Sequence, residues 1–494
     1  MDADRGEVRH LETLDRDLGR FSSLEMATGY VSRPLAAPGI ALVFIVLAGI
    51  VAAVLFGQSN NSLIIVVAAA LGAYMAVNIG ANDVANNMGP AVGARALTMG
   101  GAIAIAAVFE SAGALIAGGD VVSTVAKGIA DPHSMGTSTT FIWAMMAALL
   151  ASALWVNLAT WVGAPVSTTH AVVGGVMGAG IAAAGFGAVD WQTMGAIAAS
   201  WVISPVLGGL IAAMFLWFIK HNIVYRDDKI AAARRWVPVL VGVMAGAFAA
   251  YLSLKGLKHL VHISFDRALL IGLAVGVLCW LMMIPVVRAQ SEGLENRNRS
   301  LKALFGIPLV VSAALLSFAH GANDVANAVG PLAAIVHASQ TADFSDSFGI
   351  PSWVMVIGAM GISFGLFLFG PRLIQMVGNQ ITRLNPMRAY CVALSAAITV
   401  ILASWLGLPV SSTHIAIGAI FGVGFFREWN AHRRMHLARA AIPAELQIGA
   451  EERRRRKLVR RSHFLTIVTA WIVTVPAAAG LSALLFLLVR TIAG

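Results

Sequence analysis

The chain has 494 residues, of which 58% are apolar and only 12% are charged, and its mean hydropathy is +0.80. Soluble domains carry about 25% charged residues, so this composition excludes an ordinary soluble protein and favours a chain that lies mostly in lipid. The net charge of +10 does not indicate nucleic-acid binding, because the basic residues gather in a few loops between apolar runs. Cys279 and Cys391 both lie in apolar runs, which argues against a disulfide or a metal site.

Apolar runs of about 20 residues are long enough to cross a bilayer as helices. The sequence predicts spans at 38–57, 62–79, 98–118, 141–163, 168–187, 195–219, 236–254, 268–287, 303–320, 351–370, 388–406, 410–426 and 464–490. The pairs at 141–187 and 388–426 are either two crossings each or re-entrant hairpins. This choice does not change the side of the membrane on which later loops fall.

Loop charge predicts the orientation in a bacterial-type inner membrane. With the N-terminus in the cytoplasm, the loops around 220–235, 288–302 and 427–463 lie inside and hold most of the Lys and Arg residues. The loops at 58–61 and 338–350 then lie outside and hold none. The outside loop that contains Lys255, Lys258 and Arg267 goes against the trend. The same alternation places the C-terminus outside.

These features divide the chain without indicating a soluble catalytic domain. We expect a cytoplasmic segment (1–37), an extra span (38–57), a first repeat half (58–235), connecting spans and a loop (236–302), a second half (303–426), a basic cytoplasmic loop (427–463) and a C-terminal span (464–494).

Two motifs recur at nearly the same offset. GANDVANNMGP at 80–90 matches GANDVANAVGP at 321–331 in nine of eleven positions, and WVGAPVSTTH at 161–170 matches WLGLPVSSTH at 405–414 in seven of ten. The protein is therefore predicted to be an ancient duplication. Because the span before the first GAND copy runs inward and the span before the second runs outward, the two halves are predicted to have inverted topology. The fold class predicted is an all-α polytopic membrane protein with an inverted-topology repeat, interrupted helices and re-entrant hairpins, with about twelve core spans plus one extra N-terminal span.

The GAND segments suggest cation binding. Gly80 and the Gly89-Pro90 pair are predicted to interrupt the first helix, and the second copy has the same breakers. An Asp within a span is costly and marks a functional site by default, and interrupted helices free carbonyl oxygens for a hard cation. Capping or helix packing is the structural alternative. The polar residues of the two copies are Asn82, Asp83, Asn86, Asn323, Asp324 and Asn327.

The PVSTTH and PVSSTH segments suggest anion binding. Pro followed by hydroxyl residues begins a helix, and the free amides of a helix N-terminus bind anions. Ordinary hydroxyl capping is the alternative. The candidate ligands are Ser167, Thr168, Thr169, Ser411, Ser412 and Thr413, and a substrate role for His170 and His414 has weaker support.

The electrostatics link the two kinds of site. The four motifs contain no Lys or Arg, so an anion would face two aspartates without a cationic side chain. A Na⁺ or a proton on each aspartate removes this repulsion, and we therefore expect cation-coupled anion symport, with Asp83 and Asp324 as Na⁺ ligands if sodium is the coupling ion. Glu110, which lies in the 98–118 span without an evident counterpart, is a third candidate or a structural hydrogen-bonding residue.

The doubled GANDVAN together with PVSTTH and PVSSTH resembles the inorganic phosphate transporter (PiT) family, over roughly residues 62–490. FESAGALIAGGDV at 109–121 also fits its pattern. The resemblance implies a Na⁺- or H⁺-coupled phosphate symporter with cation binding at Asp83 and Asp324, phosphate binding at the Asn and Ser/Thr positions above, and a glutamate implicated in transport at Glu110. Many sodium-coupled members carry a second glutamate where this chain has Ala393, which leaves the coupling ion open.

Other readings have less support. Sulfate or another tetrahedral oxyanion is the near alternative, since hydroxyls and amides do not by themselves distinguish oxyanions by the number of protons that they carry. An anion channel would not need the duplicated carboxylates, and an intramembrane enzyme would need a nucleophile or metal-ligand pair that the motifs lack. We therefore expect no enzyme activity, no cofactor beyond the co-transported cation, and phosphate and the bilayer as partners. A homodimer is left open.

Overall fold

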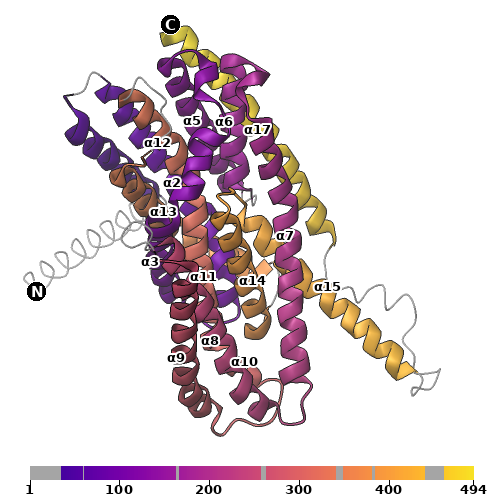
Figure 1. Ribbon diagram of the computed structural model, residues 1–494. Helices are drawn as coiled ribbons and strands as arrows, with labels where there is room; N and C mark the ends of the chain where they lie inside the picture. Colours follow the sequence, from indigo (N-terminus) through magenta and orange to yellow (C-terminus); the bar gives the residue numbers. More distant parts are fainter. Residues whose placement is uncertain are drawn as a thin grey trace, which may run out of the picture.

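The computed structural model describes residues 35–58, 61–162, 166–256, 263–340, 349–380, 384–439 and 461–493, and they are almost entirely helical (Figure 1). A helix at Leu35–Phe56 comes first. The elements after it are α2 (Ser62–Gly93), α3 (Met99–Ala117), α4 (Gly119–Ser123), η1 (Thr124–Gly128), η2 (Pro132–Met135), α5 (Ser138–Val162), α6 (Thr168–Ala184), η3 (Phe186–Ala188), α7 (Trp191–Ile219), η4 (Lys220–Val224), α8 (Lys229–Lys255), α9 (Phe265–Ser291), α10 (Leu301–Leu304), α11 (Gly306–Asp324), α12 (Ala326–Gln340), α13 (Ser352–Gln380), α14 (Pro386–Trp405), α15 (Ser412–Arg439) and α17 (Arg461–Ala493).

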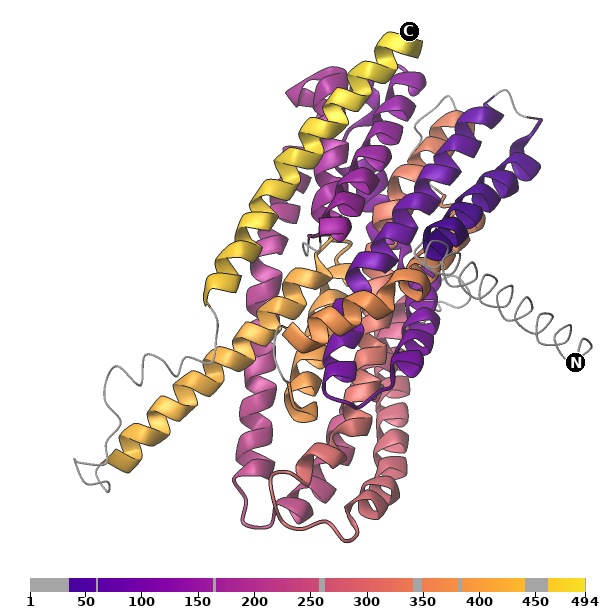
Figure 2. The same ribbon diagram turned by 180° about the vertical axis from the view of Figure 1, so that it is seen from behind.

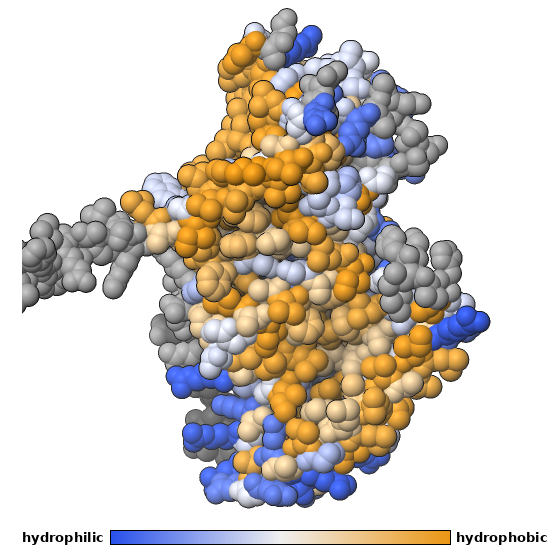
Figure 3. Space-filling model, turned by 90° about the vertical axis from the view of Figure 1, so that its left-hand side faces the viewer, coloured by the Kyte–Doolittle hydropathy of each residue, from blue (hydrophilic) through white to orange (hydrophobic). Residues whose placement is uncertain are grey.

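Eleven helices in the described residues are long and apolar enough to cross a membrane, two fewer than the sequence analysis predicted. The two that fall short are the predicted spans at 168–187 and 410–426. Helix α6 has only 17 residues, and α15 is apolar only in its first half before it continues through the polar stretch 427–439. The rest of the predicted loop up to residue 460, and residues 1–34, lie outside the described residues. Hydrophobic side chains cover most of the face seen in Figure 3, with hydrophilic ones gathered toward its ends.

The short α6 and the apolar start of α15 belong to two helical hairpins. Helices α5 and α6 lie side by side in one half of the molecule, and α14 and α15 do so in the other (Figures 1 and 2). Each hairpin packs against a long helix from the opposite half of the chain: α6 against α17, and α15 against α7. The same exchange relates α2 with α13 and α11 with α3.

Local signals explain where several helices begin. The Thr98 side chain accepts a hydrogen bond from an amide of the first turn of α3, and Asp228 caps α8 in the same way. Asn385 caps α14, which starts with Pro386 at the position that tolerates proline. Asp190 caps α7, and the amide and hydroxyl of Thr193 lower the pKa of its exposed carboxyl.

The GAND segments do not interrupt their helices as predicted. Helix α2 runs unbroken from Ser62 to Gly93, and in the second copy only Val325 separates α11 from α12 and keeps helical dihedral angles. Proline is tolerated inside membrane helices when neighbouring groups satisfy the backbone, and α2 contains Pro90 without ending there.

The glycines of these segments serve close packing instead. A Cβ on Gly80 would lie 1.9 Å from the carbonyl oxygen of Ile362 on α13, and a Cβ on Gly321 would lie 2.0 Å from the carbonyl oxygen of Glu110 on α3. Backbone therefore touches backbone at both crossings, as small residues allow in membrane proteins. Between them the hydroxyls of Ser111 and Ser363 lie 2.7 Å apart.

We expect Gly80→Ala to destabilise the protein by about 1–3 kcal/mol, because the contact that its methyl group would meet is backbone and cannot rotate away. The measurement is the thermal midpoint of the purified protein in detergent. Gly195→Ala on α7 is the matched control, since no atom lies within 4 Å of its added Cβ. Equal midpoints for the two variants would contradict the packing argument.

Candidate functional site

The tips of the two hairpins meet in the middle of the molecule. Ser167 caps α6 by accepting a hydrogen bond from the amide of His170, and Ser411 accepts one from the amide of His414 at the start of α15. The Thr169 hydroxyl donates across the junction to the carbonyl of Val410 at 3.0 Å. Two helix N-termini, each with free amides and hydroxyl donors, therefore begin beside one another.

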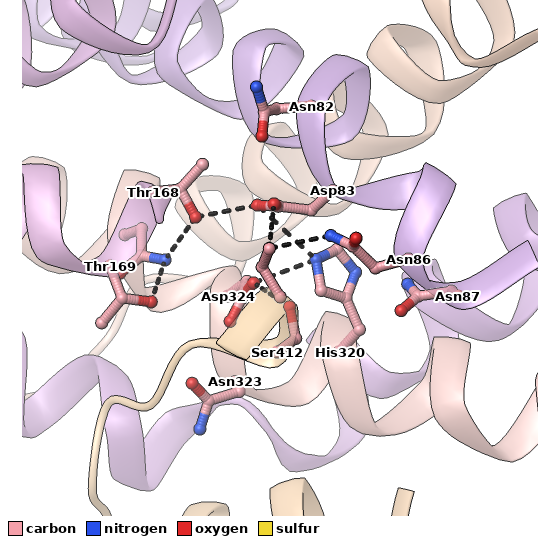
Figure 4. Close-up of polar contacts among 12 residues, drawn as sticks. Asn82, Asp83, Asn86, Asn87, Thr168, Thr169, His320, Asn323, Asp324 and Ser412 are labelled. Carbon is pink, nitrogen blue, oxygen red and sulfur yellow. Dashed lines mark hydrogen bonds and ion pairs between the residues drawn. The ribbon is translucent and has the colours of Figure 1, made fainter. Parts of the chain in front are cut away.

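Both aspartates of the GAND segments face these tips and are 1% exposed. Asp83 accepts hydrogen bonds from Thr168 at 2.9 Å and from Thr413 at 3.0 Å, so that one carboxylate is held by both hairpins (Figure 4). Asp324 accepts one from Ser412 at 3.1 Å. The structure thus brings together the aspartates and the hydroxyl residues that the sequence analysis named as candidates.

The second asparagine of each motif reaches the hairpin of the opposite half. Asn86 donates to the Thr413 hydroxyl at 2.8 Å, and Asn327 donates to the Thr169 hydroxyl at 3.1 Å. These two contacts are counterparts in the repeat. They tie each GAND helix to the hairpin contributed by the other half of the chain.

The first asparagine of each motif instead holds the hairpin of its own half. Asn82 donates to Thr160 at the end of α5 at 2.9 Å, and Asn323 donates to Ser404 near the end of α14 at 2.9 Å. Asn323 also accepts a hydrogen bond from the amide of Val410. In this conformation these two amides therefore position the tips.

A histidine that the sequence analysis overlooked lies at the centre of the site. The Nε2 atom of His320 is 3.0 Å from Asp324 and 4.0 Å from Asp83, and its Nδ1 atom is 3.2 Å from Glu110 (Figure 4 shows the ring beside the two aspartates). The ring is completely buried. His320 directly precedes the second GAND copy, which is the signal that could have identified it.

Glu110 joins this network from α3 and accepts a hydrogen bond from Asn87 at 2.9 Å. Both residues break the repeat. Ala328 takes the place of Asn87 in the second motif. Ile362 takes the place of Glu110, because the carbonyl of Ile362 lies against Gly80 as the carbonyl of Glu110 lies against Gly321. Glu110 and Asn87, two polar residues of the site that lack a polar counterpart in the other half, therefore contact each other.

Several buried oxygen atoms around the carboxylates have no hydrogen-bond partner among the described residues. They are Oδ1 of Asp324, Oε2 of Glu110, Oδ1 of Asn87 and Oδ1 of Asn327. Carboxylate and amide oxygens are the ligands that hard cations prefer. One donor atom each from Asp83, His320 and Asp324 also lie within 4.8 Å of one another, close enough to share an ion.

Two further sequence candidates lie at the edge of this arrangement. The rings of His170 and His414 contact each other, with centroids 4.4 Å apart, and His170 also packs on Trp201 at 3.9 Å. They belong to the packing of the hairpins. Ala393, at the place of the second family glutamate, is completely buried in the apolar core of α14.

The sequence profile of the phosphate transporter family matches residues 79–482. The chain belongs to this family. It is 45% identical to a Helicobacter pylori (strain J99) protein that bears the name phosphate permease, over 95% of this chain and 98% of that protein. A Pyrococcus abyssi protein of the same name is 34% identical, over 84% of this chain and 95% of its own length. A solved structure titled as the sodium-dependent phosphate transporter superposes with a TM-score of 0.77 at 33% identity, covering 87% of this chain and 100% of that one.

Family membership confirms several sequence predictions. The chain is a multi-pass membrane protein and a phosphate permease, not an enzyme. The resemblance of the doubled motifs to the inorganic phosphate transporter family is also confirmed.

We expect His320→Leu to destabilise the protein by about 3–5 kcal/mol, because it leaves the buried carboxylates of Glu110 and Asp324 without the imidazole that lies beside them. The measurement is the thermal midpoint in sodium-free buffer. Glu110→Gln and Asp324→Asn, each combined with His320→Leu, should reduce the loss, since a neutral amide needs no counter-charge. Strictly additive losses would contradict this account of His320.

Proposed function

We propose that the chain carries inorganic phosphate across the inner membrane together with Na⁺ or H⁺, by alternating access. The observation that supports this most is the junction of two hydroxyl-rich helix N-termini with two buried aspartates. One half of the junction suits an anion and the other suits a cation. The likeness to a sodium-dependent transporter favours Na⁺ as the coupling ion.

Phosphate is proposed to bind at the hairpin tips. Its ligands would be the helix amides and the hydroxyls of the PVST segments, with the GAND amides beside them. The residues are Ser167, Thr168, Thr169, Ser411, Ser412, Thr413, Asn82, Asn86, Asn323 and Asn327. In the present conformation several of these hydroxyls donate to Asp83 and Asp324 instead, so they must turn before they can donate to an anion.

Cation binding supplies the reason for that turn. A hydroxyl beside a bare carboxylate donates a hydrogen bond to it. A hydroxyl beside a carboxylate-bound cation instead directs a lone pair to the cation, which leaves its hydrogen free for another acceptor. Na⁺ or a proton on Asp83 would therefore release the protons of Thr168 and Thr413 for hydrogen bonds to phosphate. The cation also weakens repulsion between the anion and the carboxylates, which is about 4 kcal/mol per unit charge pair at 4 Å and an effective dielectric constant of 20.

Glu110 is proposed as a third cation-coupling residue. It lies beside His320 and Asn87, and its Oε2 atom has no partner among the described residues. His320 would act as a resident positive charge that stabilises the carboxylates while the site is empty of Na⁺. The asymmetry of this group means that the two aspartates are not equivalent.

Alternating access is proposed to follow from an inverted repeat with re-entrant hairpins. The exchanged packing of α6 with α17 and of α15 with α7, and the matched contacts of the two glycines, support this arrangement. Most of the site residues are almost fully buried, and only Asn82 and Asn86 among the proposed ligands are partly exposed. Transport therefore requires the hairpin tips to separate from the GAND helices on one side at a time.

Sulfate or another oxyanion remains the alternative substrate. Sulfate is an acceptor only, whereas phosphate at neutral pH carries one or two P–OH donors. The partnerless Oδ1 atom of Asn327 could accept that donor, which favours phosphate.

Proteoliposome uptake of radiolabelled phosphate, driven separately by a Na⁺ gradient and by a pH gradient, tests the proposal. We expect one gradient to drive uptake and Asp83→Asn or Asp324→Asn to abolish it. Asp190→Asn is the matched control, because Asp190 is an exposed helix cap whose carboxylate accepts hydrogen bonds from the amides of Gln192 and Thr193 at the start of α7. Uptake that depends on neither gradient would refute cation coupling. Complete displacement of phosphate by sulfate would refute the assignment of phosphate as the substrate.

Loop charge leads us to propose a cytoplasmic N-terminus and an external C-terminus. The test uses single cysteines in a background that lacks Cys279 and Cys391, the only two in the chain. On intact cells, we expect a membrane-impermeant maleimide to label Asp343→Cys and to spare Glu445→Cys. The reverse labelling pattern would show that the chain has the opposite orientation.

A further inference from the structure

A group of half-buried positive charges lies away from the hairpin tips. It forms where the end of α7 and η4, the start of α14 and the middle of α15 converge. Lys220, Arg388 and Arg427 are half-buried there, and Arg434 lies at the exposed rim. Arg427 follows Ser412 by 15 residues of continuous helix, which is about 22 Å at 1.5 Å per residue. The group is therefore separate from the central site.

The positive charges of this basic cluster repel one another. Those that act on Lys220 belong to Arg427, Arg388 and Arg434, and all are positive. The charge of Arg427 also acts on Arg388. Within the described parts of the chain, no ion pair involves any of the four. Partial burial strengthens repulsion, and it also lowers the pKa of Arg427.

Aromatic and amide contacts hold two of these side chains in place. The Nζ atom of Lys220 lies 5.3 Å from the ring centre of Phe426, and the guanidinium of Arg434 lies 4.0 Å from the ring centre of Tyr225. The Tyr225 hydroxyl accepts a hydrogen bond from Asn430 at 2.7 Å. The folded structure thus keeps the positive charges together although they repel.

Such an arrangement fits an anion that carries several oxygens. Guanidinium groups bind phosphate with paired hydrogen bonds, and a lysine adds a point charge. Basic pockets between membrane helices also bind the head groups of anionic lipids. We propose that the basic cluster of Lys220, Arg388, Arg427 and Arg434 is a second binding site for a phosphate group, supplied either by an anionic phospholipid or by free inorganic phosphate.

Arginine labelling distinguishes these sources. The full-length protein, stripped of lipid in detergent, is treated with phenylglyoxal, and labelling is read at each arginine by mass spectrometry. One arm adds phosphatidylglycerol, with phosphatidylcholine as its control, and the other adds inorganic phosphate in place of chloride. At a ligand concentration ten times its Kd, labelling of Arg388 and Arg427 should fall about tenfold. Exposed Arg299 is the reference and should not be protected selectively.

Each outcome decides one point. Protection in the first arm only identifies a lipid phosphate, and protection by inorganic phosphate identifies the free ion. The phosphate arm is repeated in Asp83→Asn, so that an effect transmitted from the central site is recognised by its loss. Protection in neither arm, or protection of Arg299 to the same extent, overturns the proposal.

A stability measurement supplies an independent check. Arg388→Gln combined with Arg427→Gln removes two of the repelling charges, and we expect the thermal midpoint of the stripped protein to rise. The rise in midpoint that the protecting ligand gives to the wild type should be lost in the same variant. Arg299→Gln is the matched control and should keep it. A double variant that retains the ligand-dependent shift would contradict the site.

Discussion

Carboxylates buried within a membrane protein impose the constraint on which this structure depends. Asp83, Asp324 and Glu110 are each at most 1% exposed, and each needs a proton donor or a cation nearby. The chain meets that need in two ways: with hydroxyls at the hairpin tips and with the single imidazole of His320. One imidazole carries at most one positive charge against three carboxylates, and the cation coupling proposed above would supply the remainder.

The hairpins supply the hydroxyl part of this answer. The hydroxyls that donate to the aspartates lie at the first residues of α6 and α15, and each of these helices begins at the middle of the molecule as one arm of a hairpin. The backbone of such a helix needs protein on every side. Packing of α6 against α17 and of α15 against α7 provides it, and the glycines at the helix crossings allow the GAND helices to lie close enough to complete the site.

Sequence reasoning found most of the site but not its shape. The duplicated motifs identified both aspartates and the hydroxyl and amide residues around them, because costly polar groups stand out in an apolar background. It wrongly read Gly80 as a helix breaker, since a glycine that ends a helix and one that permits a close crossing look the same in a single sequence. His320 was overlooked because its significance comes from its contacts with three carboxylates, and only folding brings these together. Asn87 was overlooked because the repeat comparison draws attention to what matches.

The mismatches between the halves are informative for that reason. A perfectly symmetric repeat would give two identical cation sites, and each would load with equal ease. Here His320, Glu110 and Asn87 have the apolar counterparts Ile79, Ile362 and Ala328, and the three polar residues are in contact in a chain. The hydroxyl bonds are asymmetric too, since Thr413 donates to Asp83 while its counterpart Thr169 donates to a backbone carbonyl. Asp83 thus accepts two hydrogen bonds from hydroxyls and lies farther from the imidazole than Asp324 does. An ion that binds at Asp83 would release both hairpins at once, whereas an ion at Asp324 must compete with His320. Under the proposed cation coupling, this difference would give ions at Asp83 and Asp324 distinct roles in transport.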